Sequence, residues 1–221
     1  MIFVVDFDGT AATEDTVDKL LEQHADPAWE TVEKEWLDGH IDAQECMRAQ
    51  VRLVRADRGT LASFVNSIQL DPHFKAFHDY VSHFAALAVV SDGLDYTVRN
   101  TLSREGLGTL PVFSNRLHFV GTDQLDISFP YRQSDCAGGN GVCKCSIARR
   151  LAAQHGTPVV LIGDGKSDAC LAAEADIVFA KGSLIRYCEA EGIPHTPFVD
   201  FDDVLRAVEA WNLTMRMSAT A

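Results

Sequence analysis

The chain has 221 residues, of which 47% are hydrophobic, and its formal net charge is −13. This length suits one large domain or a core with a modest second lobe. Because no dense run of Lys and Arg offsets the negative charge, we expect neither nucleic acid nor a membrane surface as a partner. A small molecule is the expected ligand, and a phosphorylated one needs local positive charge from a metal ion, a few cationic side chains or backbone amides.

The compartment is predicted from two features of the sequence. The apolar run at residues 1–5 is too short for a signal peptide, and no stretch elsewhere has transmembrane length. Six cysteines in a chain of this size do not make a disulfide scaffold. We therefore expect a cytoplasmic protein, and both a monomer and a homodimer are compatible with the sequence.

Short apolar runs of strand length, each followed within two residues by Asp, Ser or Gly, recur at residues 2–5, 87–90, 159–162 and 177–180. Their Val and Ile content is typical of strands buried on both faces, and the segments between them have helical periodicity. The pattern predicts an α/β fold in which a parallel sheet is wrapped by helices. Alternating residues at 116–120 and 124–129 add a small β-hairpin, which we expect to project as a flap.

The segment between the first two predicted strands is longer than one crossover helix requires. Its periodicity is helical, so we expect residues 14–84 to form an inserted helical cap over the carboxyl ends of the strands. Residues 1–13 and 85–212 then form the sheet core. Residues 213–221 lose periodicity and are expected to be a loose tail.

Two carboxylates follow the first predicted strand on alternate residues, in the sequence Asp6-Phe7-Asp8-Gly9-Thr10. A pair with this spacing can hold a divalent ion and still offer an oxygen for nucleophilic attack, and Gly9 lets the backbone turn sharply. The alternative is an Asx-type turn without a ligand, which is common for one Asp-Gly but rarer for two carboxylates after a buried run. The pattern favours a functional site.

The second predicted strand ends in Ser91-Asp92-Gly93, where a hydroxyl and two backbone amides can cradle an anion without adding a formal charge. A helix N-cap without a ligand explains this triplet equally well. Lys144 opens a later helical stretch, and a lysine is unfavourable at a helix start unless an anion lies nearby. We expect it to point into the same cleft, in preference to Lys166, which lies inside a turn and is expected to be exposed.

The third predicted strand ends in Gly163-Asp164, and Asp168 follows one helical turn later. Such oxygen ligands suit magnesium, which keeps some water and is completed by substrate phosphate. Acidic residues at a helix start also stabilise its dipole, which explains one of the two carboxylates better than both. Together the strand-end residues supply a nucleophile, an acid or base, a hydroxyl, a lysine and metal ligands, a set that predicts an enzyme.

The order D-x-D-G-T, S-D-G, a lone Lys and G-D-x-x-S-D resembles the haloacid dehalogenase superfamily, and the helical insertion resembles its phosphoserine-phosphatase-like branch. The resemblance implies a Rossmann-like core with Asp6 as nucleophile and Asp8 as general acid and then base. It also implies that Ser91 and Lys144 bind phosphate. It implies further that Asp164 and Asp168 secure Mg²⁺, and Asp6 and Asp8 are expected to be metal-binding residues with them. Substrate contacts are expected from Gly9, Thr10, Asp15, Arg48, Asp92, Gly93 and Ser167.

Within that branch the chain is similar to the group of phosphatases that act on 2-hydroxy-3-keto-5-methylthiopentenyl-1-phosphate. The residues that carry this likeness lie at 27–29, at 91–95 and in the cysteine-rich approach to Lys144. The second motif reads S-D-G here, where several members of the group have S-G-G.

The expected activity is therefore Mg²⁺-dependent hydrolysis of a small phosphomonoester through an aspartyl-phosphate. Dehalogenation is disfavoured, because release of a halide needs no proton donor at Asp8. The alternatives are a phosphotransferase on the same scaffold, a phospho-aspartate receiver domain and a pure binding module. Zinc binding by Cys136, Cys143 and Cys145 is a further possibility, although their spacing lacks paired C-x2-C knuckles.

Overall fold

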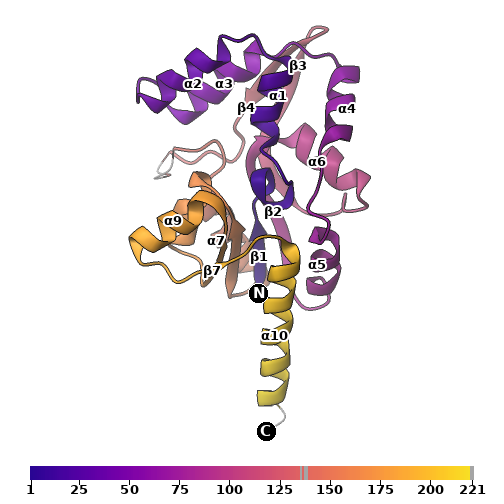
Figure 1. Ribbon diagram of the computed structural model, residues 1–221, viewed down its shortest axis with the longest axis vertical. Coiled ribbons are helices and arrows are strands. Elements are labelled where there is room, and N and C mark those ends of the chain that lie inside the picture. Colours follow the sequence, from indigo (N-terminus) through magenta and orange to yellow (C-terminus); the bar gives the residue numbers. More distant parts are fainter. Residues whose placement is uncertain (135, 137–138, 220–221) are drawn as a thin grey trace.

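The computed structural model describes the backbone of residues 1–134, 136 and 139–219 (Figure 1). Its sheet has seven strands in the order β4-β3-β2-β1-β5-β6-β7. The strands are β1 (Ile2–Val5), β2 (Ala86–Leu94), β3 (Val112–Val120), β4 (Gln124–Ser128), β5 (Val159–Gly163), β6 (Ile177–Ala180) and β7 (Thr196–Pro197). Within the described part of the chain all neighbouring strands are parallel except β3 and β4. The predicted α/β fold with a mainly parallel sheet is confirmed.

Strand β1 lies in the middle of the sheet and determines where the polar residues meet. Val5 pairs with Val89 of β2 and with Ile162 of β5, so the three strands are in register near their carboxyl ends. All residues of β1 are buried, which explains its unbroken apolar sequence. Asp6 and the residues that follow the two neighbouring strands therefore leave the sheet at one edge, where open α/β sheets bind ligands.

Helices cover both faces of the sheet, because alternate residues of the buried strands point to opposite sides. The helices outside the insertion are α5 (Phe74–Val81), α6 (Asp95–Arg104), α7 (Lys144–His155), α8 (Ala169–Ala172), α9 (Gly182–Glu191) and α10 (Phe201–Ala219). Phe3 of β1 belongs to a core with α5, α6 and α10. Ile2 and Val4 belong to a second core with α7, α8 and α9. Figure 1 shows the two groups of helices on either side of the sheet.

The insertion after β1 stands over the carboxyl edge of the sheet (Figure 1) and contains α1 (Thr16–His24), α2 (Trp29–Leu37), α3 (Ala43–Leu53) and α4 (Arg58–Ser67). Its two ends meet at the base, where the amide of Thr13 donates to the carbonyl of Gln69 at 3.0 Å. The sequence predicts a cap over residues 14–84, but α5 lies against the sheet, with the rings of Phe77 and Phe3 5.4 Å apart. The packing favours a cap that ends near residue 70.

The starts of three cap helices follow from the local sequence. Asp15, Asp42 and Asp57 precede α1, α3 and α4, and each carboxylate accepts a hydrogen bond from an amide of the first turn. These bonds satisfy amides that have no partner inside a helix. At α3 the bond is reciprocal, because Glu45 also accepts from the amide of Asp42.

The β3–β4 hairpin supports the cap. β3 pairs with β2 in its first half and with β4 in its second half. Arg52 of α3 donates two hydrogen bonds to the carboxylate of Asp126, at 3.2 and 3.0 Å. The guanidinium of Arg58 lies 3.9 Å from the ring centroid of Phe119. The predicted hairpin is confirmed, and it lies against the cap helices α3 and α4, while residues 121–124 at its turn are exposed.

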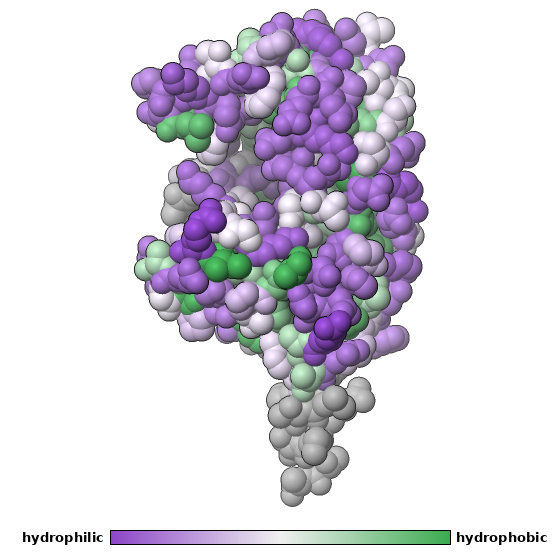
Figure 2. All heavy atoms as spheres, in the orientation of Figure 1, coloured by the Kyte–Doolittle hydropathy of each residue, from purple (hydrophilic) through white to green (hydrophobic). Residues whose placement is uncertain are grey.

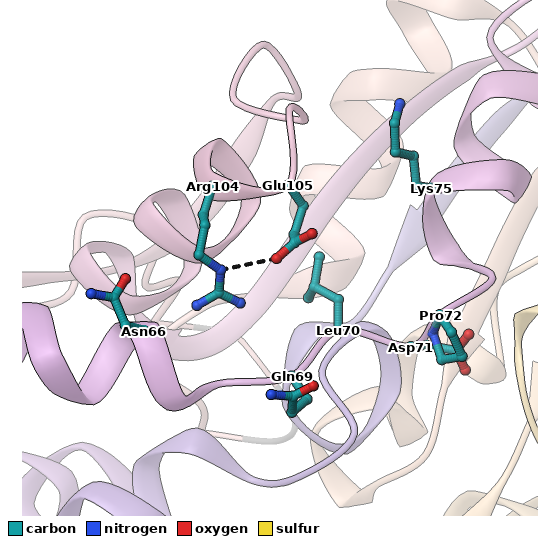
Figure 3. A pocket seen from close by; sticks show the side chains of 8 residues that line it. All are labelled: Asn66, Gln69, Leu70, Asp71, Pro72, Lys75, Arg104 and Glu105. Atoms are coloured by element: carbon teal, nitrogen blue, oxygen red, sulfur yellow. Dashed lines mark hydrogen bonds and ion pairs between the residues drawn. The ribbon is translucent and has the colours of Figure 1, made fainter.

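A cavity of about 460 Å³ lies where the cap rejoins the core (Figure 3). On its wall, Arg104 at the end of α6 donates to the carbonyl oxygens of Val65 at 2.6 Å and Ile68 at 2.5 Å. These carbonyls lie at the carboxyl end of α4, where helical carbonyls lack partners and attract cations. The Nε of Arg104 also donates to Glu105 at 2.9 Å. One core side chain thus ties down the end of the cap.

The end of the chain differs from the prediction. Helix α10 continues through Ala219, so residues 213–219 are helical and not a loose tail, while residues 220–221 lie outside the described part. This segment contains no Gly or Pro, and a helix that is already anchored extends at little cost. None of the helices in the described part of the chain has the length and apolar character needed to cross a bilayer.

Candidate active site

Three carboxylates from two strand ends meet at the carboxyl edge of the sheet. One oxygen each of Asp6, Asp164 and Asp168 lies within 4.8 Å of the others, which is close enough to hold one metal ion. Asp6 is 5% exposed and Asp168 is fully buried. The donors are all carboxylate oxygens, the ligands that Mg²⁺ prefers in proteins, so this set of residues fits that ion.

Lys144 lies beneath this carboxylate cluster at the start of α7. Its Nζ is 2.9 Å from Oδ1 of Asp6 and 2.6 Å from Oδ1 of Asp168, and it donates to the hydroxyl of Ser167 at 3.0 Å. Burial alone would lower the pKa of Lys144, but the charges of Asp168 and Asp6 raise it above its usual range. The lysine is therefore a permanent cation, as the prediction that it points into the site requires.

The ionised cluster carries an excess of negative charge. Three carboxylates face one ammonium group in direct contact, and Lys181 adds only a more distant positive charge near Asp164, so negative charge prevails in this largely buried place. Burial and then the charge of Asp168 raise the pKa of Asp6 well above its usual value, although Lys144 opposes them. Burial likewise raises the pKa of Asp164. A bound divalent cation would balance this charge.

The turn after β1, Phe7–Ala11, contacts the carboxylate of Asp164. Gly9 has φ +66°, and a Cβ at this position would lie 2.6 Å from Oδ2 of Asp164. The hydroxyl of Thr10 donates to Oδ1 of Asp164 at 2.7 Å. The structure thus brings Gly9 and Thr10 to the carboxylate cluster, but neither is among the described residues that line the cleft above it.

Asp8 is held apart from the carboxylate cluster. Its Oδ1 accepts hydrogen bonds from the amide and the hydroxyl of Thr16, at 2.9 and 2.5 Å, and its Oδ2 accepts one from Ser91 at 3.0 Å. Burial, followed by the charge of Asp15, raises the pKa of Asp8 to about 6. The Asp8 carboxylate lies outside the group formed by Asp6, Asp164 and Asp168, because the chain turns directly after β1 and its oxygens face Thr16 and Ser91. A place for Asp8 among the metal ligands stays a prediction.

The segment Ser91-Asp92-Gly93 lies beside Asp8. A Cβ at Gly93 would come within 2.4 Å of Oδ2 of Asp8, so only glycine leaves room for that carboxylate. The amide of Gly93 donates to the hydroxyl of Ser91 at 2.8 Å, which orients it. Oδ1 of Asp92 accepts from the amide of Val142 at 2.8 Å, two residues before Lys144. Asp92 thereby connects the segment Ser91-Asp92-Gly93 to the residues that precede Lys144.

A cleft of about 840 Å³ opens between this constellation and the cap. Figure 2 shows the surface hollowed between the α2–α3 pair and the core part that contains α9. Asp6, Asp8, Asp92 and Asp164 lie at its core side, and Asp15 lines it from the start of α1. The arrangement offers a nucleophilic carboxylate, a second carboxyl group, a cation and a covered space for a small ligand.

The comparisons with known proteins agree with this constellation. A profile described as haloacid dehalogenase-like hydrolase matches residues 3–173. The chain belongs to this family. It is 32% identical over 214 residues to a 2-hydroxy-3-keto-5-methylthiopentenyl-1-phosphate phosphatase of Geobacillus kaustophilus, a match that covers 95% of this chain and 96% of the relative. A phosphatase of the same name from Exiguobacterium sibiricum is 34% identical over 207 residues, covering 90% and 92%.

The fold is similar to that of a solved, substrate-bound phosphoserine phosphatase. The TM-score is 0.71 at 19% sequence identity, and the match covers 93% of this chain and 97% of that one. The predicted family is confirmed, and the chain is a phosphoric monoester hydrolase that acts on a small phosphorylated substrate. These relatives give no support to a receiver domain or a pure binding module.

Two of the predicted substrate contacts of this hydrolase come from opposite sides of the cleft. Asp15 lines the cleft but already caps α1, accepting from the amides of Val17 at 2.9 Å and Asp18 at 3.0 Å. Ser167 lines the cleft from the core side and accepts from Lys144.

Arg48, a predicted substrate contact, is not among the described residues that line the cleft. It is exposed, and its guanidinium lies 5.2 Å from the ring centroid of Phe129. Helix α3 turns Cys46, Met47 and Gln50 toward the cleft instead, so Arg48 falls outside the described residues that line it. The apolar positions of α3 indicated the buried face, but not which part of that face meets a ligand.

In the part of the chain that the structure describes, the cysteines do not form a group that could hold zinc. Among the described residues, only the three aspartates bring as many as three possible ligands together. Cys143 and Cys145 flank Lys144 and pack in the apolar core on the side of α7. Zinc binding by Cys136, Cys143 and Cys145 therefore gains no support.

Two polar residues that shape the site were not predicted from the sequence. Thr16 holds Asp8, and its position one residue after the helix cap Asp15 was the available signal. Asn115 is fully buried, and its amide donates to the carbonyl of Asp92 at 2.5 Å. A polar residue at an inward position of a strand was the only hint of its role.

Proposed function

We propose that this hydrolase is a Mg²⁺-dependent phosphatase that works through an aspartyl-phosphate on Asp6. The observation that carries the proposal is the charge under the cleft, where the carboxylates of Asp6, Asp164 and Asp168 outnumber the ammonium group of Lys144 that contacts them. The three aspartates would hold Mg²⁺, which when bound stabilises the negative charge of the phosphoryl group during transfer.

In the proposed first step, a carboxylate oxygen of Asp6 attacks the phosphorus atom. The bond between phosphorus and the ester oxygen breaks, and Asp8 donates its proton to the departing oxygen. Burial and the charge of Asp15 raise the pKa of Asp8 to about 6, which supports a role as proton donor near neutral pH. Asp6 and Asp8 share one edge of the cleft, as this step requires.

In the proposed second step, water attacks the phosphorus atom of the aspartyl-phosphate. Asp8, now ionised, takes the proton of the water, and the bond between phosphorus and Asp6 breaks to release phosphate. Ser91 and Lys144 would bind the oxygens of the phosphoryl group. Their support is their position, since Ser91 donates to Asp8 and Lys144 contacts Asp6.

The names of the relatives suggest the substrate. Two of them are phosphatases of 2-hydroxy-3-keto-5-methylthiopentenyl-1-phosphate, and each matches at least 90% of this chain. We propose an ester of this kind as the substrate. The cytoplasmic location and the assembly as a monomer or a homodimer stay predictions.

The test is phosphate release from a panel of small phosphomonoesters, with and without Mg²⁺, by the wild type and by Asp6→Asn. Asp38→Asn, at an exposed position after α2, is the matched control. We expect release that needs Mg²⁺, is lost in Asp6→Asn and persists in Asp38→Asn. Inorganic phosphate and the free alcohol should appear in equal amounts, because a phosphotransferase would also release the alcohol but would pass the phosphoryl group to a second alcohol. Release that Asp6→Asn leaves unchanged would refute the nucleophile.

A further inference from the structure

The cap side of the cleft is acidic. Asp15, Asp18 and Glu33 line it from α1 and α2. Of the described residues that line the cleft, Lys166 is the only one with a positive charge, and its ammonium lies 5.2 Å from the ring centroid of Trp36. The part of a substrate that lies beyond the phosphate therefore meets negative charge and almost no positive charge.

Glu33 is fixed in this position by a neighbouring helix. Its Oε2 accepts a hydrogen bond from Nε2 of Gln50 at 2.8 Å, and Gln50 is only 5% exposed. The thiol of Cys46 lies 3.8 Å from the same oxygen. A carboxylate held by a buried amide stays in place when a ligand enters, in contrast to a solvated surface glutamate.

The acidic groups of the cap lie close together and carry charges of the same sign. Burial, followed by the charges of Asp15, Glu33 and Glu22, raises the pKa of Asp18 to about 6. Like charges in a partly covered space repel a further anion, and they accept hydrogen bonds from hydroxyl groups or a cation.

The rest of the cap lining is apolar. Val17, Trp36 and Met47 contribute it from the cap, and Phe129 contributes it from the end of the hairpin. Such a wall buries hydrocarbon or thioether groups of a ligand. The composition of the wall thus matches a ligand with apolar parts and hydrogen-bond donors.

We propose that Glu33, assisted by Asp18, is a specificity-determining residue that rejects phosphomonoesters whose leaving alcohol carries a carboxylate. Esters of uncharged, partly apolar alcohols are the favoured class. This inference rests on the proposed phosphatase function. It sets the protein apart from an enzyme for phosphoglycerate-like esters, since three cap carboxylates line the cleft and Lys166, on the core side beside Trp36, is the one cation among its described lining residues.

The test uses two esters that differ in one group, glycerol 3-phosphate and 3-phosphoglycerate, with the full chain in Mg²⁺. We expect kcat/KM of the wild type to favour glycerol 3-phosphate by about tenfold or more, because a like charge at close range costs more than a kcal/mol. Glu33→Gln retains an oxygen that can accept from Gln50 and removes the charge. It should raise kcat/KM for 3-phosphoglycerate about tenfold relative to glycerol 3-phosphate.

Asp18→Asn is a second variant in case Glu33→Gln fails to fold, and it should shift the ratio in the same direction. Glu30→Gln, at an exposed position of α2 that does not line the cleft, should leave the ratio unchanged. Equal hydrolysis of both esters by the wild type, or a ratio that neither cleft variant moves, overturns the inference alone. If neither these esters nor p-nitrophenyl phosphate is hydrolysed, the proposed function falls and this inference with it.

Discussion

Nζ of Lys144 lies 2.9 Å from Oδ1 of Asp6, and both side chains are almost fully buried. The lysine is the one described cation in contact with the carboxylate cluster, since it also lies 2.6 Å from Asp168. Removing one partner of a buried ion pair leaves uncompensated charge, which costs about 3–5 kcal/mol. We expect Lys144→Met to lower the free energy of unfolding by that amount in metal-free buffer, as measured by urea denaturation.

The control for this change is Lys75→Met, because Lys75 forms an exposed ion pair with Asp79 one helical turn away. Such a pair contributes only about 0.3–0.5 kcal/mol. Equal losses in the two variants would contradict the central place of Lys144 in the charge balance.

Asp8→Asn should separate the two chemical steps. Loss of the proton donor and acceptor lowers the rate by about 10²–10⁴-fold for an ester with a poor leaving group. p-Nitrophenolate leaves without a proton, so this ester should still phosphorylate Asp6, while the following hydrolysis stays slow. We expect a burst of about one nitrophenol per active site in rapid-mixing experiments. A variant that shows neither a burst nor a rate loss would assign no proton transfer to Asp8.

The carboxylate of Asp92 should position the approach to Lys144 through its bond to the amide of Val142. Asp92→Ala leaves that amide without its acceptor, which costs about 1–3 kcal/mol when the group is buried. Asp92→Asn retains an oxygen that can accept the bond and should restore most of the stability and kcat. If both variants lose kcat equally, the charge and not the hydrogen bond is what matters.

Mg²⁺ should stabilise the fold through the carboxylate cluster. An ion that binds only the folded state adds about 2.7 kcal/mol at one hundred times its dissociation constant. We expect Mg²⁺ to raise the Tm of the wild type and of Asp38→Asn, and to leave that of Asp164→Asn nearly unchanged. The same shift in all three proteins would place the ion elsewhere.

The stability of the cap should depend on pH through Asp18. Its pKa of about 6 in the folded chain lies above the ordinary 3.8, because burial and neighbouring carboxylates disfavour its charge. The charged form therefore weakens the fold above pH 6, and stability from this group is regained as pH falls from about 6 to 4. Asp18→Asn should raise Tm at pH 8, and this gain should vanish near pH 4. Glu30→Gln is the control, and a gain independent of pH would contradict the assignment.

Much of the core could be predicted because its signals are local. The buried strand Ile2–Val5 and the β-hairpin follow from runs of a few residues. The order of polar residues after these strands indicated the family and the carboxylates of the cluster. The limits of the cap were harder to predict, because α5 has the same helical period as the cap helices but packs on the sheet.

The sequence by itself determined that Asp6, Ser91 and Asp164 each follow a short apolar run, and a parallel sheet brings the carboxyl ends of such runs to one edge. Only the tertiary structure decided which side chains share a site. The carboxylate of Asp8 accepts hydrogen bonds from Thr16 and lies apart from the carboxylate cluster. The carboxylate of Glu33 accepts one from Gln50 of another helix. Contacts of this kind join residues far apart in the chain or on opposite sides of a turn. Local periodicity carries no information about them, because it records only which face of each element is buried.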